Sequence, residues 1–259
     1  TIFTYEYEAI IPGLLKRWYE ERQEMQRKMR ECGDNEIERE YWDKRQLVKK
    51  INLNSLYGAI LNPGCRFFDI RIGQSVTLTG RCITKHMASK VNEIVTGEYD
   101  HKGESIVYGD TDSVYFSAYK TLQKEIKDGL IPWTKDSVVG LYDKISEEVN
   151  SSFKSFMTKA FHTPATRGEV IAAGRELVAS KGLFITKKRY AVLYYDKEGK
   201  RTDVEGKEGK MKAMGLDLKR SDTPVFVQDF LSEILYMVLS GNEEKKVLDR
   251  ISEFRAEFK

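Results

Sequence analysis

The chain has 259 residues, and 43 Lys and Arg face 40 Asp and Glu, which gives a formal net charge of +3. A hydrophobic content of 41% with so small a net charge excludes a disordered chain. No apolar run approaches the roughly twenty residues of a membrane span, no secretory leader opens the chain, and three scattered cysteines exclude a disulfide framework. We therefore expect a cytoplasmic protein without a membrane partner.

The basic excess is confined to one part of the chain. Residues 181–220 hold 12 basic against 6 acidic side chains, whereas the first 180 residues are balanced and residues 221–259 are slightly acidic. Such a local excess is typical of a polyanion-binding surface or of a solvated loop, and charge alone does not separate the two.

The first sixty residues predict two helices. Residues 4–31 have helical spacing of apolar side chains, broken only at Pro12-Gly13. The segment 33–35 supplies a helix stop and a new N-cap, and a second helix is expected over residues 36–57. So short a connection predicts an antiparallel helical hairpin, although a coiled-coil-like interaction module has the same pattern.

The remainder predicts a mixture of helices and antiparallel strands, and hence an α+β fold. Helices are expected over residues 74–95 and 137–161, and again over 224–259 with an interruption at Gly241. Strands are expected over residues 105–108, 114–116 and 183–195, the last followed by a turn at 197–200 and a further short strand.

The first two of these strands flank a pair of carboxylates. Asp110 and Asp112 stand two residues apart at the tip of the predicted hairpin, so their side chains point to nearly the same side in an extended backbone. Repulsion between them would be removed by a hard divalent cation such as Mg²⁺. Asp is also common in turns, so an isolated Asp-x-Asp pair is weak support for a metal site.

A basic face is predicted on the helical hairpin. Lys50, Asn54 and Tyr57 share one face of the second helix, and Arg22 on the first helix is expected about 8 Å from Lys50 along the hairpin axis. Arg supplies a planar fork and Lys a point charge, which together suit a triphosphate. Tyr57 then provides a flat aromatic ring, and Gly58 beside it has no side chain, so a flat base pair could stack there.

Three motifs in order resemble the family B (polymerase α-like) DNA polymerases, most closely the tailed-phage replicative type. Residues 50–58 match K-x-x-x-N-S-x-Y-G, residues 108–113 match Y-G-D-T-D-S, and residues 187–190 match K-K-R-Y. The resemblance covers fingers, later palm and the start of the thumb. It implies a fingers helical hairpin at 1–62, a palm with an antiparallel sheet at 63–222, and the start of the thumb at 223–259. Within this palm it implies a catalytic hairpin at 104–117 and DNA-contacting strands at 181–220.

The resemblance also implies residue roles. Asp110 and Asp112 would be the catalytic metal ligands for two Mg²⁺ ions, with Mn²⁺ as a substitute, and Glu169 is a looser candidate near them. The residues that would bind the incoming dNTP are Arg22, Lys50, Asn54 and Tyr57. Those that would contact primer–template DNA are Gly58, Thr111, Lys187, Lys188, Arg189 and Tyr190.

Two departures from the family pattern bear on activity. The family usually has a second basic residue four positions after the fingers arginine, and here that position is Gln26. The first palm motif, D-x-x-S-L-Y-P, is not found in this chain. We therefore expect little polymerase activity without a partner segment carrying that motif and the exonuclease, whether the chain is a split subunit or a fragment.

These observations leave two hypotheses from different classes. The first is template-directed DNA synthesis by two-metal nucleotidyl transfer from dNTP to the primer 3′-OH, with a sliding clamp as a further candidate partner and the host cytoplasm as the location of a phage enzyme. The alternative is a non-catalytic nucleic-acid-binding fragment that uses only the basic strand.

Overall fold

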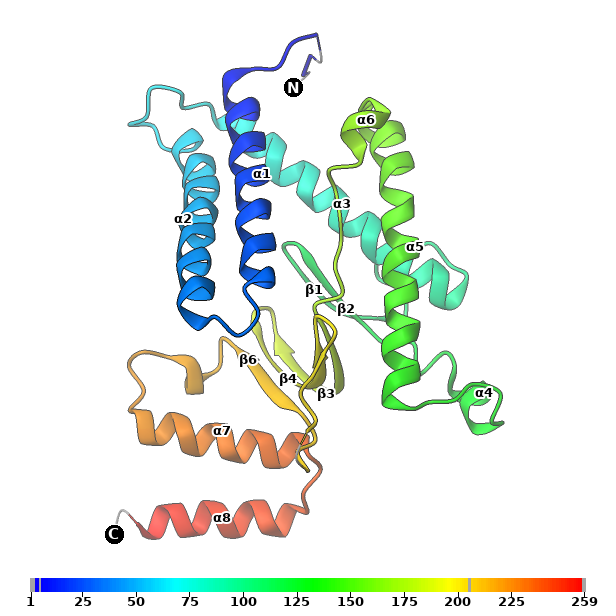
Figure 1. Ribbon diagram of the computed structural model, residues 1–259. Coiled ribbons are helices and arrows are strands. Elements are labelled where there is room, and N and C mark those ends of the chain that lie inside the picture. The colour runs from blue at the N-terminus through cyan, green and yellow to red at the C-terminus, as the bar shows by residue number, and fades with distance from the viewer. Residues whose placement is uncertain (1–2, 5, 205, 258–259) are drawn as a thin grey trace. The chain divides into compact units, whose positions relative to one another are not determined.

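The computed structural model describes residues 3–4, 6–204 and 206–257. The chain divides into two compact units, Thr1–Cys82 and Ile83–Lys259, and helix α3 (Ile70–Thr96) runs through the boundary. Helices and antiparallel sheets occur in irregular order along the chain (Figure 1), so the predicted α+β class is confirmed.

The first unit is built on a pair of antiparallel helices. Helices α1 (Ile10–Glu31) and α2 (Glu36–Ile60) lie side by side (Figure 1). Gly33 at the connection has a φ of +54°, a conformation that favours glycine, and the Asn35 side chain accepts from the Glu38 amide at 3.2 Å as the N-cap. The expected start at residue 4 is wrong. Helix α1 begins only at Ile10, so Pro12 lies in its first turn, where a missing N–H costs nothing.

The second unit begins with the end of α3 and a two-stranded sheet. Strands β1 (Ile106–Asp110) and β2 (Ser113–Phe116) pair antiparallel, with Asp110 opposite Ser113. The predicted hairpin with the two aspartates at its tip is therefore confirmed.

The first core of this unit joins that hairpin to two long helices. Helix α5 (Lys135–Phe161) begins at Thr134, which forms a capping box with Ser137. One side of α5 packs with α3 and with the inward side chains of β1 and β2. The buried residues of this cluster are Val91, Ile145, Val149 and Phe153. Two short helices, α4 (Gln123–Lys127) and α6 (Ala165–Gly168), lie on either side of α5 in the sequence.

The second sheet corrects one prediction. The single strand expected over residues 183–195 is wrong, because this stretch belongs to two strands, β3 (Leu177–Thr186) and β4 (Arg189–Lys197). Lys188 has a φ of +63°, and the chain reverses direction there. The apolar and basic residues of 183–195 continue across this turn, so the sequence pattern did not mark it. Strand β4 is also paired with β5 (Lys200–Arg201) and β6 (Lys210–Met214).

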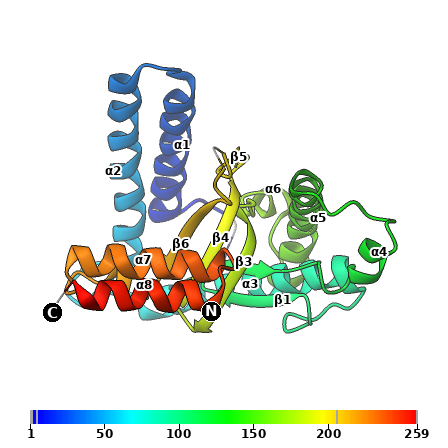
Figure 2. The same cartoon turned by 90° about the horizontal axis from the view of Figure 1, so that it is seen from below.

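The chain then ends in a helical layer beneath this sheet. After the short 3₁₀ helix η1 (Asp217–Lys219), helices α7 (Val225–Leu239) and α8 (Glu244–Ala256) lie side by side (Figure 2). The expected interruption at Gly241 is confirmed, with a φ of +78°. A second apolar core forms between α7 and the sheet from Ala191, Leu193, Ala213, Leu216, Leu218 and Leu239. None of the helices in the described ranges has the length and apolar character needed to cross a membrane.

Candidate active site

The two aspartates lie on a strained two-residue turn. Thr111 has a φ of +50°, which is unfavourable for a β-branched residue, and glycine is usual at the first position of such turns. The Asp112 amide donates to the Asp110 carbonyl at 2.6 Å, so the backbone bends sharply between the two carboxylates. The Thr111 hydroxyl donates to the Asp110 carboxylate at 3.2 Å.

Neither of the two carboxylates has a cationic partner within the described residues. Asp110 is half-buried and Asp112 is exposed, and neither forms an ion pair within the described residues. Asp143, Asp196 and Asp203 are each paired with Arg or Lys in the same unit. An uncompensated pair of oxygen donors fits a hard divalent cation such as Mg²⁺. No group of three His, Cys, Asp or Glu that could hold a metal forms within the described ranges.

An aromatic cluster links the carboxylate hairpin to the β3–β4 hairpin. Tyr108 and Tyr115 of the first hairpin pack against Phe184 and Tyr190 of the second, with ring centroids 5.3–5.4 Å apart between the hairpins. The Lys188 amide donates to the Tyr108 hydroxyl at 2.7 Å. Burial raises the pKa of Tyr115, whose hydroxyl donates to that of Tyr190 at 3.3 Å. Two motifs eighty residues apart are therefore held together in one unit.

The turn that joins β3 and β4, Lys187–Arg189, forms an exposed basic tip, which we call the basic turn. All three of its side chains are exposed, whereas the neighbouring Tyr190 is buried in the aromatic cluster. Arg189 reaches Asp217 only at 3.9 Å, so most of its charge remains available. The basic turn thus presents three cations on a hairpin that is bonded to the carboxylate hairpin.

In the first unit, a contact with α2 fixes the position of Arg22 on the helical hairpin. Its Nε donates to Gln46 of α2 at 3.2 Å, and Gln46 lies one helical turn before Lys50 on the same face. Lys50 and Asn54 are exposed. The Tyr57 hydroxyl donates to the Gly73 carbonyl at 3.4 Å, which connects α2 with α3. Arg22 and Lys50 therefore lie in the same stretch of the hairpin.

Glu169 is engaged elsewhere. It follows α6, is exposed, and pairs with Lys154 of α5 at 2.5 Å. The hydrogen bond from Lys154 lowers the pKa of Glu169. No contact within the described residues joins it to the carboxylate hairpin.

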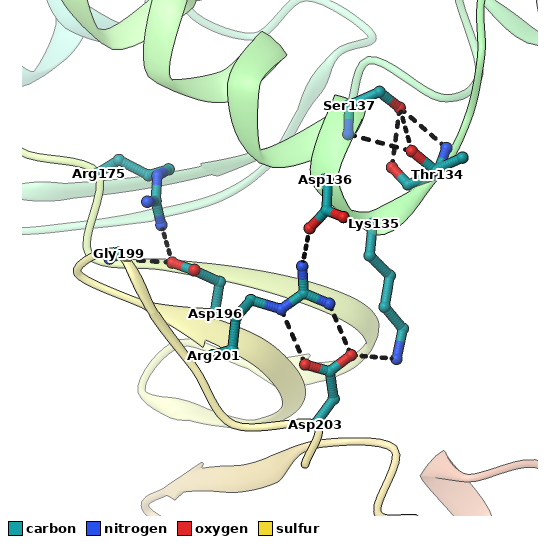
Figure 3. A network of polar contacts seen from close by, with 9 residues as sticks. All are labelled: Thr134, Lys135, Asp136, Ser137, Arg175, Asp196, Gly199, Arg201 and Asp203. Carbon is teal, nitrogen blue, oxygen red and sulfur yellow. Dashed lines mark hydrogen bonds and ion pairs between the residues drawn. The ribbon is translucent and has the colours of Figure 1, made fainter.

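An ion-pair network fastens the second sheet to α5. Figure 3 shows Arg201 between Asp203, which it contacts with two nitrogens, and Asp136 at the start of α5. Lys135 also donates to Asp203, at 2.7 Å. Nearby, Arg175 donates to the buried Asp196 of β4 at 2.6 Å, as Figure 3 also shows. These contacts hold in place the sheet that carries the basic turn.

Comparison with known proteins identifies the family. The model of DNA polymerase family B matches residues 3–258. The chain belongs to DNA polymerase family B. The resemblance of its three motifs to this family is thereby confirmed.

The most similar family B relatives include two phage enzymes. The chain is 33% identical over 210 residues to the DNA-directed DNA polymerase of Escherichia phage RB69. This alignment covers 76% of this chain and 22% of the relative. It is 30% identical over 226 residues to the DNA-directed DNA polymerase of Enterobacteria phage T4. This alignment covers 83% of this chain and 24% of the relative. The chain therefore spans about a quarter of the length of these relatives.

A solved family B structure shares the fold. This is the family B DNA polymerase of Pyrobaculum calidifontis. The structural alignment covers 99% of this chain and 26% of the Pyrobaculum chain, with a TM-score of 0.51 and 19% sequence identity. This likeness concerns the fold alone.

Sequence reasoning about this family B chain missed two supporting residues. Tyr108 stands inside the matched Y-G-D-T-D-S motif, and its position there was the available signal. Thr84 of α3 lies in no motif, yet its hydroxyl donates to the Thr111 carbonyl at 2.9 Å. Nothing in the local sequence pattern pointed to that contact.

Proposed function

We propose that this chain supplies part of the active site of a template-directed DNA polymerase. The reaction is attack of the primer 3′-OH on the α-phosphate of a dNTP, with pyrophosphate leaving. The observation that carries the proposal is the bonding of the carboxylate hairpin to the basic turn through Tyr108 and Lys188. A site for cations and a site for a nucleic-acid backbone then lie on neighbouring hairpins of one unit.

Asp112 and Asp110 would hold the divalent ions. Two bound Mg²⁺ ions would activate the primer hydroxyl and neutralise charge on the leaving pyrophosphate. The absence of a cationic partner for either carboxylate in the described residues supports this role, because a nearby Lys or Arg would compete with the ions. The turn presents both carboxylates from a short, sharply bent backbone.

The helical hairpin would bind the dNTP. Arg22 and Lys50 would hold the triphosphate together with Asn54, through charge-assisted hydrogen bonds. Tyr57 and Gly58 would form the floor under the new base pair. A Cβ at Gly58 would meet no other segment of the described chain within 4 Å, so packing of the helix does not require a glycine here. Close approach of a flat base pair would require one.

The basic turn would contact the primer–template near the primer end. Lys187, Lys188 and Arg189 would bind backbone phosphates, with Thr111 and Tyr190 beside them. Phosphate contacts of this kind position the duplex without reading its sequence.

We further propose how these parts belong to a whole enzyme. Residues 1–62 would be fingers, 63–222 palm and 223–259 the start of the thumb. Synthesis would require the remainder of a family B polymerase, including the segment with the first palm motif and the exonuclease, and a sliding clamp is a candidate partner. Glu169 remains a candidate palm residue, and a phage enzyme of this kind would act in the host cytoplasm.

Primer extension with dNTPs and Mg²⁺ tests the proposal. The chain is assayed alone and together with a polypeptide that carries the first palm motif, and synthesis is expected only from the combination. In the active combination, Asp112→Ala should lower the rate by roughly 100-fold or more, since it removes charge stabilisation at the reacting phosphate. Asp128→Ala, an exposed aspartate outside the hairpin, is the matched control.

Two results would count against the proposed function. Robust synthesis by the chain alone would contradict the need for the partner segment. Synthesis at the wild-type rate after Asp112→Ala would remove Asp112 from the metal site, and the alternative of a non-catalytic nucleic-acid-binding fragment would then be favoured.

A further inference from the structure

The turn between the two aspartates needs support from outside the hairpin. Thr111 is exposed and holds a positive φ that a β-branched residue adopts only when its surroundings impose it. The hydrogen bonds inside the turn join residues that are adjacent or nearly so in the sequence. Such contacts move with the turn and do not hold it relative to the rest of the unit.

Helix α3 runs beside the hairpin and is fixed to it at the far end. The buried Asn92 accepts from the amide and the hydroxyl of Ser105, at 3.2 and 2.8 Å, just before β1 begins. Ile83 and Met87 of the same helix pack in the core cluster with Ile106 and Phe116 of the hairpin. The helix is therefore a rigid support along the hairpin.

Thr84 extends this support to the tip. It follows Ile83 on α3, and its Oγ1 donates to the Thr111 carbonyl at 2.9 Å across 27 residues of sequence. The acceptor is the peptide group between Thr111 and Asp112, so this hydrogen bond acts directly on the backbone that orients the Asp112 carboxylate.

We infer that Thr84 is a positioning residue of the metal site. Its hydroxyl holds the Thr111–Asp112 peptide so that the carboxylates of Asp110 and Asp112 converge on a cation. This inference rests on the proposed function, because it gives Thr84 a role toward ions that the two aspartates bind.

The test compares variants of the full chain by NMR. Thr84→Val removes the hydroxyl with little change of volume, and Thr84→Ser retains the hydroxyl. Thr77→Val is the matched control, because within the described residues the Thr77 hydroxyl bonds to carbonyls of its own helix alone, those of Gly73 and Gln74. Asp112→Asn reports on the site itself. The readouts are exchange of the Asp112 amide with water and paramagnetic broadening of residues 110–113 by added Mn²⁺.

Thr84→Val should speed exchange of the Asp112 amide and raise the Mn²⁺ concentration for half-broadening, each about five-fold, the ratio expected for loss of one ordinary hydrogen bond. Thr84→Ser should restore both values, and Thr77→Val should leave both unchanged. Unchanged exchange of the core amides of Val149 and Leu193 shows that the unit remains folded. If Thr84→Val does not fold, Thr84→Ala replaces it.

Wild-type values in Thr84→Val, with Mn²⁺ broadening lost in Asp112→Asn, would overturn the inference and leave the proposed function standing. A defect in Thr84→Ser as large as that in Thr84→Val would also overturn it, because packing of the methyl group would then be responsible. If Mn²⁺ broadens no residue of the wild-type hairpin, the metal role fails instead. The exchange rate of the Asp112 amide then decides whether Thr84 holds the turn.

Discussion

At the scale of single residues, the site depends on backbone conformations that side chains normally avoid. Lys188 at the basic turn has a φ of +63°, and its carbonyl lies against Gly215, which follows β6. A Cβ on Gly215 would come within 2.1 Å of the Lys188 carbonyl oxygen, and Gly215 itself has a φ of +61°. Glycine is required here both by the close approach and by the conformation.

Gly215→Ala should therefore destabilise the chain. The expected loss in the free energy of unfolding is about 2 kcal/mol, from the left-handed backbone and the contact with a carbonyl that cannot move freely. Urea denaturation gives the value. Gly140→Ala in α5 is the control, since a Cβ there meets no atom within 4 Å, and it should raise stability by up to about 1 kcal/mol. Equal stability of the Gly215→Ala variant and the wild type would contradict the close approach of Lys188.

At the scale of secondary-structure elements, charged contacts decide how α5 and the second sheet stay together. Asp203 is nearly buried and accepts from Arg201 at 2.7–2.8 Å and from Lys135 at 2.7 Å. These hydrogen bonds hold the pKa of the Asp203 carboxyl well below its usual range. The carboxylate is therefore bound more tightly in its charged form in the folded chain than in the unfolded one.

This shift predicts how stability depends on pH. Because the folded pKa is depressed, the contribution of Asp203 is complete above its unfolded pKa of about 4 and is lost as the pH falls through the folded value. Asp203→Asn should be less stable than the wild type at pH 7, and the gap should narrow as the pH falls from about 5 to about 2. The difference in stability is measured from the denaturation midpoints of both proteins across this pH range. Asp249 of α8 is exposed and forms no ion pair with any residue that the structure describes, so Asp249→Asn should show no such difference in stability. A difference for Asp203→Asn that does not vary with pH would rule out the network as its source.

At the scale of the whole molecule, a net charge of +3 conceals a localised basic surface. The excess of basic residues lies within 181–220, and the structure shows that three of them form the exposed basic turn. Others in the same stretch, such as Arg201 and Lys212, are paired with carboxylates. The cations of this stretch that adjoin the carboxylate hairpin are therefore those of the basic turn.

Salt dependence of DNA binding tests this surface. Each phosphate contact that is lost should reduce the slope of log affinity against log salt concentration by about 0.9. Replacing residues 187–189 by Ala should therefore flatten the slope by about 2 to 3, measured with a primer–template duplex. Replacing Lys124, Lys127 and Lys246 instead removes equal charge from α4 and α8 and should change it little. An equal effect of both triple variants would place the DNA contacts elsewhere.

The amino-acid sequence by itself determined the features that depend on a few neighbouring residues. Helical periodicity, the stop at Gly33 and the cap at Asn35 predicted the helical hairpin. The short apolar runs on either side of Asp110 and Asp112 predicted the carboxylate hairpin. These patterns act over one or two turns of chain, so they can be read locally. The three motifs were also sufficient to indicate the family, because residue identity and order carry that information.

Only the tertiary structure decided which distant segments meet. The division of residues 183–195 between two strands depends on Lys188, whose positive φ is stabilised by the Tyr108 hydroxyl eighty residues earlier and by the space at Gly215. The contact of Thr84 with Thr111 likewise depends on α3 packing along the hairpin. Such contacts form because the chain buries its apolar surfaces together, and no local periodicity records which polar groups that packing brings within hydrogen-bonding distance.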